Sequence, residues 1–212
     1  SVDSEGTPIC VAIDSVETLE FSSSDHSGDG HSDDDEHSGV DPPFFSDPAR
    51  MAVAAEGLTD CIVAAVPALD NEGVRTTAEE YIAELEELDA EVESALASVP
   101  EERRVLVTNH EVFGYFADRY GFEVAGAILP ASTQSEADAA ALAELAELIQ
   151  AEGVAAVFAD ASAPSQLADA LATEAGEVQV VELFSESLGP DGGETYVEMV
   201  RTNAQRIADA LA

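Results

Sequence analysis

Apolar positions in the second half of the chain follow two alternating patterns. Short, nearly continuous apolar runs predict strands that are buried on both faces of a sheet. Stretches in which apolar residues recur every three or four positions predict amphipathic helices between them. The predicted strands are residues 105–108, 123–127, 155–159 and 178–183, and the predicted helices are residues 110–120, 136–151, 164–175 and 194–211. This alternation predicts an α/β fold with a parallel sheet and flanking helices.

The first half of the chain predicts two long helices and one short strand. Asp47 is a typical N-cap residue and Pro48 suits the first helical position, so a helix is predicted to begin here and extend to Val66. The residues expected on its buried face are Met51, Ala55, Leu58, Ile62 and Val66. A longer amphipathic helix is predicted at residues 75–99, and the apolar run at residues 9–13 predicts a strand. The residues expected on the buried face of the long helix are Tyr81, Leu85, Leu88, Val92 and Leu96.

Residues 21–39 are a low-complexity tract of serine, aspartate, glycine and histidine, with almost nothing to bury. We therefore expect a disordered loop. The tract holds three of the four histidines of the chain, His26, His31 and His37. An acidic tract with several histidines can bind divalent metal loosely, whereas each histidine taken singly is better explained as part of a solvated linker.

The net charge of the chain argues against some classes of binding partner. The chain carries 45 acidic residues against 7 basic ones, all of them arginine, which gives a formal net charge of -38. This balance argues against nucleic acid and an anionic membrane surface as partners, because both attract positive charge. An acidic surface without lysine is typical of adaptation to high salt, which screens repulsion between charges. We expect a halophilic protein whose stability falls at low ionic strength.

Targeting signals and cysteines say little about the function of the chain. No run of residues is long and apolar enough to span a bilayer. The chain begins at Ser1 rather than at methionine and shows no signal peptide, so we expect a processed product or a fragment. The two cysteines, Cys10 and Cys61, could form a disulfide or remain as two reduced, buried thiols.

Three potential metal ligands follow the ends of predicted strands. His110, Asp160 and Glu186 come just after the first, third and fourth of these strands. Parallel strands end at the same edge of a sheet, so these side chains are expected to meet there if their strands are near neighbours. One imidazole and two carboxylates suit a divalent metal ion. Thr108 and Asn109 are expected to cap the helix that follows the first strand.

Each of these three residues also has an explanation without a metal. His110 could be a polar residue in a first helical turn, Asp160 could cap the helix near residue 164, and Glu186 could be solvated. The sequence shows no motif for nucleophilic catalysis or phosphate binding at these positions, because the chain has no G-x-S-x-G sequence and no P-loop. His110 is the one histidine outside the low-complexity tract, which leaves little room for a Ser-His-Asp triad.

Five stretches of the chain follow one another in the order and spacing of a known family. They are DPPFFSDPARM, YIAELEELDAEVESAL, VTNHEVFGYFADRYG, VAAVFADASAPSQLADALATEAG and VVELFSESLGPDGGETYVEMVRTNAQRIADAL. From about Asp41 to its end, the chain therefore resembles the cluster A-I solute-binding proteins of metal ABC transporters, the zinc and manganese receptors of the ZnuA/TroA type.

The resemblance implies two α/β lobes joined by one long, rigid helix, with metal held between the lobes. It implies a partial N-terminal lobe at residues 1–74, a connecting helix at residues 75–99, and a C-terminal lobe of the TroA-like, chelatase-like fold at residues 100–212. It also implies a solute-binding protein rather than an enzyme, which captures Zn(II) or Mn(II) outside the cell for the permease of an ABC transporter. A lipid anchor upstream of Ser1 is compatible with this location.

The same resemblance assigns the metal ligands. It implies that His110 is the imidazole ligand of the C-terminal lobe, as in the zinc-type members. Asp160 stands where the family usually has glutamate, and Glu186 stands where it usually has aspartate, so both carboxylates are kept. The acidic, histidine-rich tract at residues 21–39 also matches the zinc-type members.

Two departures separate the chain from the family pattern. The family motif DPHxW carries a ligand histidine where this chain has Pro43, whose side chain has no donor atom. The first lobe of the family begins well before the counterpart of Ser1 and supplies another histidine, so we expect most of that lobe to be absent. The alternative is therefore a truncated or degenerate paralogue that acts as an interaction or adhesion module without tight metal binding. A hydrolase that uses a bound metal to activate water is a third hypothesis, for which no general base is apparent.

Overall fold

The computed structural model describes residues 8–19, 43–108, 112–127, 139–161, 166–176 and 178–212. Within these ranges lies a four-stranded parallel sheet with the strand order β2-β1-β3-β4. The strands are β1 (Val105–Thr108), β2 (Glu123–Ala127), β3 (Ala156–Asp160) and β4 (Gln179–Leu183). All four predicted strands are confirmed, each within one residue of its expected bounds.

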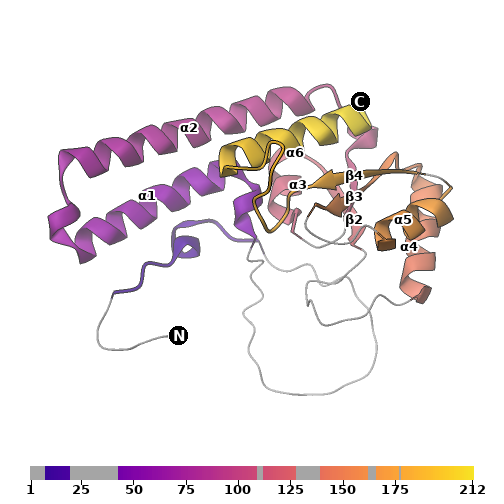
Figure 1. Ribbon diagram of the computed structural model, residues 1–212, viewed down its shortest axis with the longest axis horizontal. Coiled ribbons are helices and arrows are strands. Elements are labelled where there is room, and N and C mark those ends of the chain that lie inside the picture. The colour runs from indigo at the N-terminus through magenta and orange to yellow at the C-terminus, as the bar shows by residue number, and fades with distance from the viewer. Residues whose placement is uncertain (1–7, 20–42, 109–111, 128–138, 162–165, 177) are drawn as a thin grey trace, which may run out of the picture.

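Two long helices precede the sheet, α1 (Pro48–Ala65) and α2 (Glu72–Leu96), joined through the short 3-10 helix η3 (Pro67–Leu69). Tyr81 is 37% exposed, against the prediction. The reason is that helix α6 (Tyr196–Leu211) lies along only the second half of α2 (Figure 1). The other four residues predicted for the inner face of α2 are buried, namely Leu85, Leu88, Val92 and Leu96.

Helices cover both faces of the sheet (Figure 1). Besides α6, those of the second half are α3 (Gly114–Tyr120), α4 (Ala139–Glu152) and α5 (Gln166–Glu174). On one face of the sheet, Leu106 and Phe158 pack in a core with α2, α3 and α6. On the other face, Val107 and Val157 pack with α4 and α5. Successive strand residues point to opposite faces, so nearly continuous apolar runs are what a sheet covered on both sides requires.

The buried face of α1 differs from the prediction. Ile62 and Val66 were expected inside but are exposed. Helix α1 is packed on two sides, by α2 and by the short 3-10 helix η1 (Ala12–Ser15), so its buried surface is not a single stripe. The approach of η1 is close, because a Cβ atom added at Gly57 would collide with the side chain of Ser15.

The predicted strand at residues 9–13 is wrong. Only its last two residues are in regular structure, at the start of η1, which lies against α1. A disulfide joins Cys10 to Cys61 with their Cα atoms 5.9 Å apart, which decides between the two alternatives for the cysteines. Further along, the N–H of Leu19 donates to the hydroxyl of Tyr115 at 3.0 Å. Within the described part of the chain, every strand pairs inside the four-stranded sheet, which leaves this apolar segment to pack on a helix.

Helix α3 begins later than predicted. Its N-cap is Phe113, so Thr108 and Asn109 do not cap it. The delay has a packing reason, since Val112 and Phe113 are buried in the core before the helix starts. The predicted end is confirmed, because Gly121 closes α3 in the left-handed conformation with φ 69°.

The first turn of α1 is fixed by Asp47, as predicted. Its Oδ1 accepts from the N–H groups of Ala49 and Arg50 at 2.9 and 3.2 Å, and its Oδ2 accepts from the Arg50 guanidinium at 2.7 Å. Asp47 is only 1% exposed. Burial raises the pKa of Asp47, although the hydrogen bonds and charge of Arg50 oppose this shift. The cap therefore combines helix capping with a buried charge.

Replacing Asp47 with alanine is expected to lower the free energy of unfolding by about 2 kcal/mol, because the cap and one of the two ion pairs of Arg50 are both lost. Asp47→Asn keeps a capping oxygen and loses only the charge, so its loss should be clearly smaller. Urea unfolding in molar potassium chloride measures both. Equal losses would show that the ion pair, and not the cap, stabilises this turn.

Candidate metal site

The carboxyl ends of β1, β3 and β4 lie side by side, as the metal-site hypothesis requires. Thr108 of β1 pairs with Phe158 of β3, and Asp160 of β3 pairs with Leu183 of β4. The N–H of Ala161 donates to the carbonyl of Leu183 at 2.8 Å, which extends the contact between β3 and β4 beyond the last strand pair. Side chains that follow these three strands therefore share one edge of the sheet.

Asp160 is a buried carboxylate at this edge, with an exposed fraction of 6%. Its Oδ2 accepts a hydrogen bond from the Oγ of Ser185, which is buried as well. Ser185 lies just beyond the end of β4, so this hydrogen bond joins two neighbouring strand ends. A hydrogen bond that orients a carboxylate is typical of the groups behind a metal ligand. Ser185 was not predicted from the sequence, in which a serine beside an acid resembles a surface residue.

The remaining predicted ligands are placed only in part. Glu186 follows Ser185 and is exposed. His110 lies outside the described residues, and so do the three histidines of residues 21–39. Among the residues that the structure describes, no group of three or more His, Cys, Asp or Glu side chains could hold a metal ion. The structure therefore brings Asp160 and the stretch carrying Glu186 to one edge and leaves the imidazole untested.

The segment before α1 is tied to two helices of the C-terminal half. The hydroxyl of Tyr196 on α6 donates to the carbonyl of Phe45 at 2.9 Å, and the N–H of Phe116 on α3 donates to the Oγ of Ser46 at 3.2 Å. Burial raises the pKa of Tyr196, so its hydroxyl stays protonated and able to donate. Pro43, at the start of this segment, is buried. It offers no ligand atom from its side chain.

A small cavity of about 20 Å³ lies between this segment and the end of β4. Its lining includes Phe45, Ser46, Phe113, Phe184, Ser185 and Asn203. A space of this size holds about one water molecule. The cavity therefore suits a small species and has no room for an organic substrate.

Known proteins resemble this chain in sequence. The family described as "Zinc-uptake complex component A periplasmic" (ZnuA) matches residues 2–210. The zinc-binding protein TroA of Treponema pallidum is 44% identical over 139 residues, which cover 62% of this chain and 45% of TroA. The manganese-binding lipoprotein MntA of Bacillus subtilis is 35% identical over 144 residues, which cover 65% of this chain and 47% of MntA. The chain thus spans about half the length of these curated relatives.

Solved structures show the same fold. Periplasmic zinc-binding TroA of Treponema pallidum matches with a TM-score of 0.75 at 34% identity, over 84% of this chain and 66% of TroA. A manganese-bound periplasmic metal-binding protein of Candidatus Liberibacter asiaticus gives a TM-score of 0.81 at 19% identity, over 99% of this chain and 73% of that protein, and supports the fold alone. In the described ranges, no helix combines the length and apolarity needed to cross a membrane. Because the family match extends over nearly the whole chain, this protein belongs to the ZnuA family, described as zinc-uptake complex component A, periplasmic.

Proposed function

We propose that this chain captures Zn(II), with Mn(II) as the alternative cargo, and delivers it to the permease of an ABC importer. Membership of the ZnuA family supports the proposal, and relatives named for zinc and for manganese suggest the two metals. The observation that carries it is the buried carboxylate of Asp160, oriented by Ser185 at the shared end of three parallel strands. The metal is cargo, so the function is binding and release.

The proposed ligands are His110, Asp160 and Glu186. His110 follows β1 in the sequence, and the two acids lie at the ends of β3 and β4, so the three come from strands that are adjacent in the sheet. One nitrogen and two carboxylates suit Zn(II), and the carboxylates also suit Mn(II), which prefers oxygen. The weaker, accessory donors that we propose are His26, His31 and His37.

The proposal includes a division of the chain. Residues 1–74 would form part of an N-terminal lobe, residues 75–99 the connecting helix, and residues 100–212 the C-terminal lobe. Helix α2 packs on α1 and, along its second half, on α6, as a connecting element would (Figure 1). We place the protein at the outer cell surface, in line with its lipoprotein and periplasmic relatives.

Pro43 supports a second candidate function. It is buried at the position where the family resemblance implies a ligand histidine. A paralogue with this substitution would keep the fold and act as an interaction or adhesion module without tight metal binding.

Zinc titration calorimetry in molar potassium chloride separates the two candidates. Transport predicts one zinc ion per chain with a submicromolar Kd, and an affinity at least about tenfold lower in His110→Ala. A chain without residues 21–39 should keep the affinity of the main site, because the proposed ligands lie elsewhere. Micromolar or weaker binding, with no rise in melting temperature on adding zinc, would favour the interaction module.

A further inference from the structure

Asn203 of helix α6 makes two hydrogen bonds with the backbone of Phe184, the residue just before the candidate site. The Nδ2 of Asn203 donates to the carbonyl of Phe184 at 2.6 Å, and the N–H of Phe184 donates to the Oδ1 of Asn203 at 2.9 Å. Asn203 is 6% exposed, so both bonds are shielded from water. β4 ends at Leu183, and the amide of Asn203 supplies the donor and the acceptor that a next strand residue would offer.

The ring of Phe184 is also held in place. The guanidinium carbon of Arg206 lies 5.1 Å from the ring centroid. The turn beyond the site packs directly on the ring, since a Cβ atom added at Gly189 or Gly193 would come within 2.9 and 2.7 Å of ring carbons. Phe184 is therefore fixed through both its backbone and its side chain.

The fixed residue leads directly into the proposed ligands. Ser185 comes next in the chain, and its hydroxyl donates to the carboxylate of Asp160. Glu186 follows Ser185. A shift of the Phe184 backbone would therefore move the hydroxyl that orients one proposed ligand and the backbone that carries the other.

The same helix also holds a second residue that lines the cavity, Phe45. Tyr196 stands seven residues before Asn203, which is two helical turns, so both side chains lie on one face of α6. The hydroxyl of Tyr196 donates to the carbonyl of Phe45, which lines the cavity together with Phe184. Helix α6 thus holds two residues that line the cavity: Tyr196 binds Phe45, and Asn203 binds Phe184.

We propose that Asn203 is a positioning residue for the metal site, which acts by fixing Phe184 and, through it, Ser185. The role rests on the proposed function, because it needs a metal to position ligands for. Metal ligands must lie within a few tenths of an ångström of their ideal distances. Loss of a partner behind the ligands typically lowers metal affinity about 10- to 100-fold, and we expect a change in this range here.

The test compares variants of the full chain in molar potassium chloride. Asn203→Leu is close in size and removes both bonds to Phe184, whereas Asn203→Asp keeps the acceptor for the Phe184 N–H and places a carboxylate oxygen, in place of the donor, against the Phe184 carbonyl. Ile207→Val alters the core one turn further along α6 and serves as the control for altered packing. Zinc affinity is measured by calorimetry, and cobalt(II) absorption reports the geometry around a bound metal. Thermal unfolding of the metal-free chain identifies variants that do not fold.

Asn203→Leu and Asn203→Asp should each lower zinc affinity about 10- to 100-fold and alter the cobalt spectrum, and Ile207→Val should change neither. If Asn203→Leu does not fold, Asn203→Asp decides. A folded Asn203 variant with unchanged affinity and spectrum would overturn the role of Asn203 and leave the proposed function standing. Absence of zinc binding by the unmodified chain would overturn the proposed function and this role with it.

Discussion

Replacing Asp160 with alanine is expected to weaken zinc binding by more than about 100-fold, which exceeds the usual loss for a residue behind the ligands. Asp160 is the buried member of the two proposed carboxylates, and the hydroxyl of Ser185 orients it. Alanine removes a ligand atom and the negative charge that offsets the metal, and it leaves Ser185 without this acceptor. Calorimetry in molar potassium chloride measures the change.

Two further variants separate ligand loss from structural damage. Asp160→Asn keeps the shape and an acceptor for Ser185 but is neutral, so it should fold normally and still lose most of the zinc affinity. Glu147 is exposed on α4, and Glu147→Ala removes one negative charge away from the strand ends. If Asp160→Ala bound zinc as tightly as Glu147→Ala, the site would not be at the ends of β3 and β4.

The parallel sheet could be predicted from sequence because the local pattern and the packing agree. Strand β3 is buried along its whole length, so its apolar run is continuous apart from the final Asp160. Gly121 marks the end of α3, because the residue there adopts a left-handed backbone conformation, which glycine adopts without strain. Both signals are local, and neither depends on which element packs where.

Packing between distant elements could not be predicted in this way. The length of α6 leaves Tyr81 of α2 partly exposed, and nothing in the periodicity of α2 contains that information. The apolar residues 9–13 fit a strand equally well, but a disulfide to Cys61 and the narrow approach at Gly57 place that segment on α1. These outcomes depend on contacts far apart in sequence, which a pattern along one segment does not contain.

The part of the candidate site that depends on the parallel sheet could be predicted from the sequence. Residues after parallel strands share an edge, so Asp160 and the stretch of Glu186 were expected to meet if their strands were neighbours, and the strand order shows that they are. Ser185 and Asn203 did not follow, because a serine beside an acid and an asparagine in an amphipathic helix resemble surface residues. Their roles come from hydrogen bonds between a loop and a helix, which only the three-dimensional register determines.

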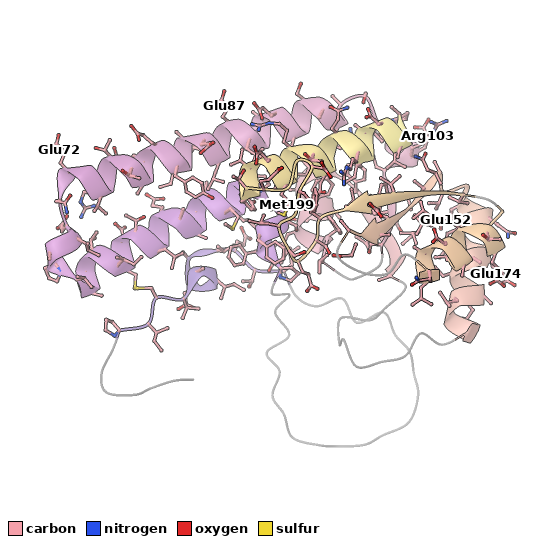
Figure 2. All side chains as sticks on the ribbon, viewed as in Figure 1. Glu72, Glu87, Arg103, Glu152, Glu174 and Met199 are labelled. Atoms are coloured by element: carbon pink, nitrogen blue, oxygen red, sulfur yellow. A yellow bond between two sulfur atoms is a disulfide. The ribbon has the colours of Figure 1, made fainter. Side chains whose placement is uncertain are left out.

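The second large expected effect is a loss of stability at low salt, which the negative charge of the chain causes. The chain has 45 acidic and 7 basic residues. Four arginines form ion pairs, and the other three donate to backbone carbonyls, so they offset little of the excess. Acidic side chains such as Glu72 and Glu87 extend outward from α2 (Figure 2). Two charges about 20 Å apart in water repel by about 0.2 kcal/mol, and an excess of 38 charges forms several hundred pairs. Unfolding moves these charges apart and relieves part of the repulsion, so at low salt the repulsion opposes a folding free energy of only about 5–15 kcal/mol.

Transfer from molar potassium chloride to about 0.01 M salt is therefore expected to unfold the chain at room temperature, because the Debye length grows from about 3 to about 30 Å. Circular dichroism and melting temperatures across a potassium chloride series measure the transition, and returning the salt should restore the fold. Sucrose at matched osmolality is the control, since it favours compact states without screening charge. Rescue by sucrose as complete as that by salt would assign the effect to solvent exclusion. A melting temperature independent of salt would show that the acidic surface does not repel itself enough to matter.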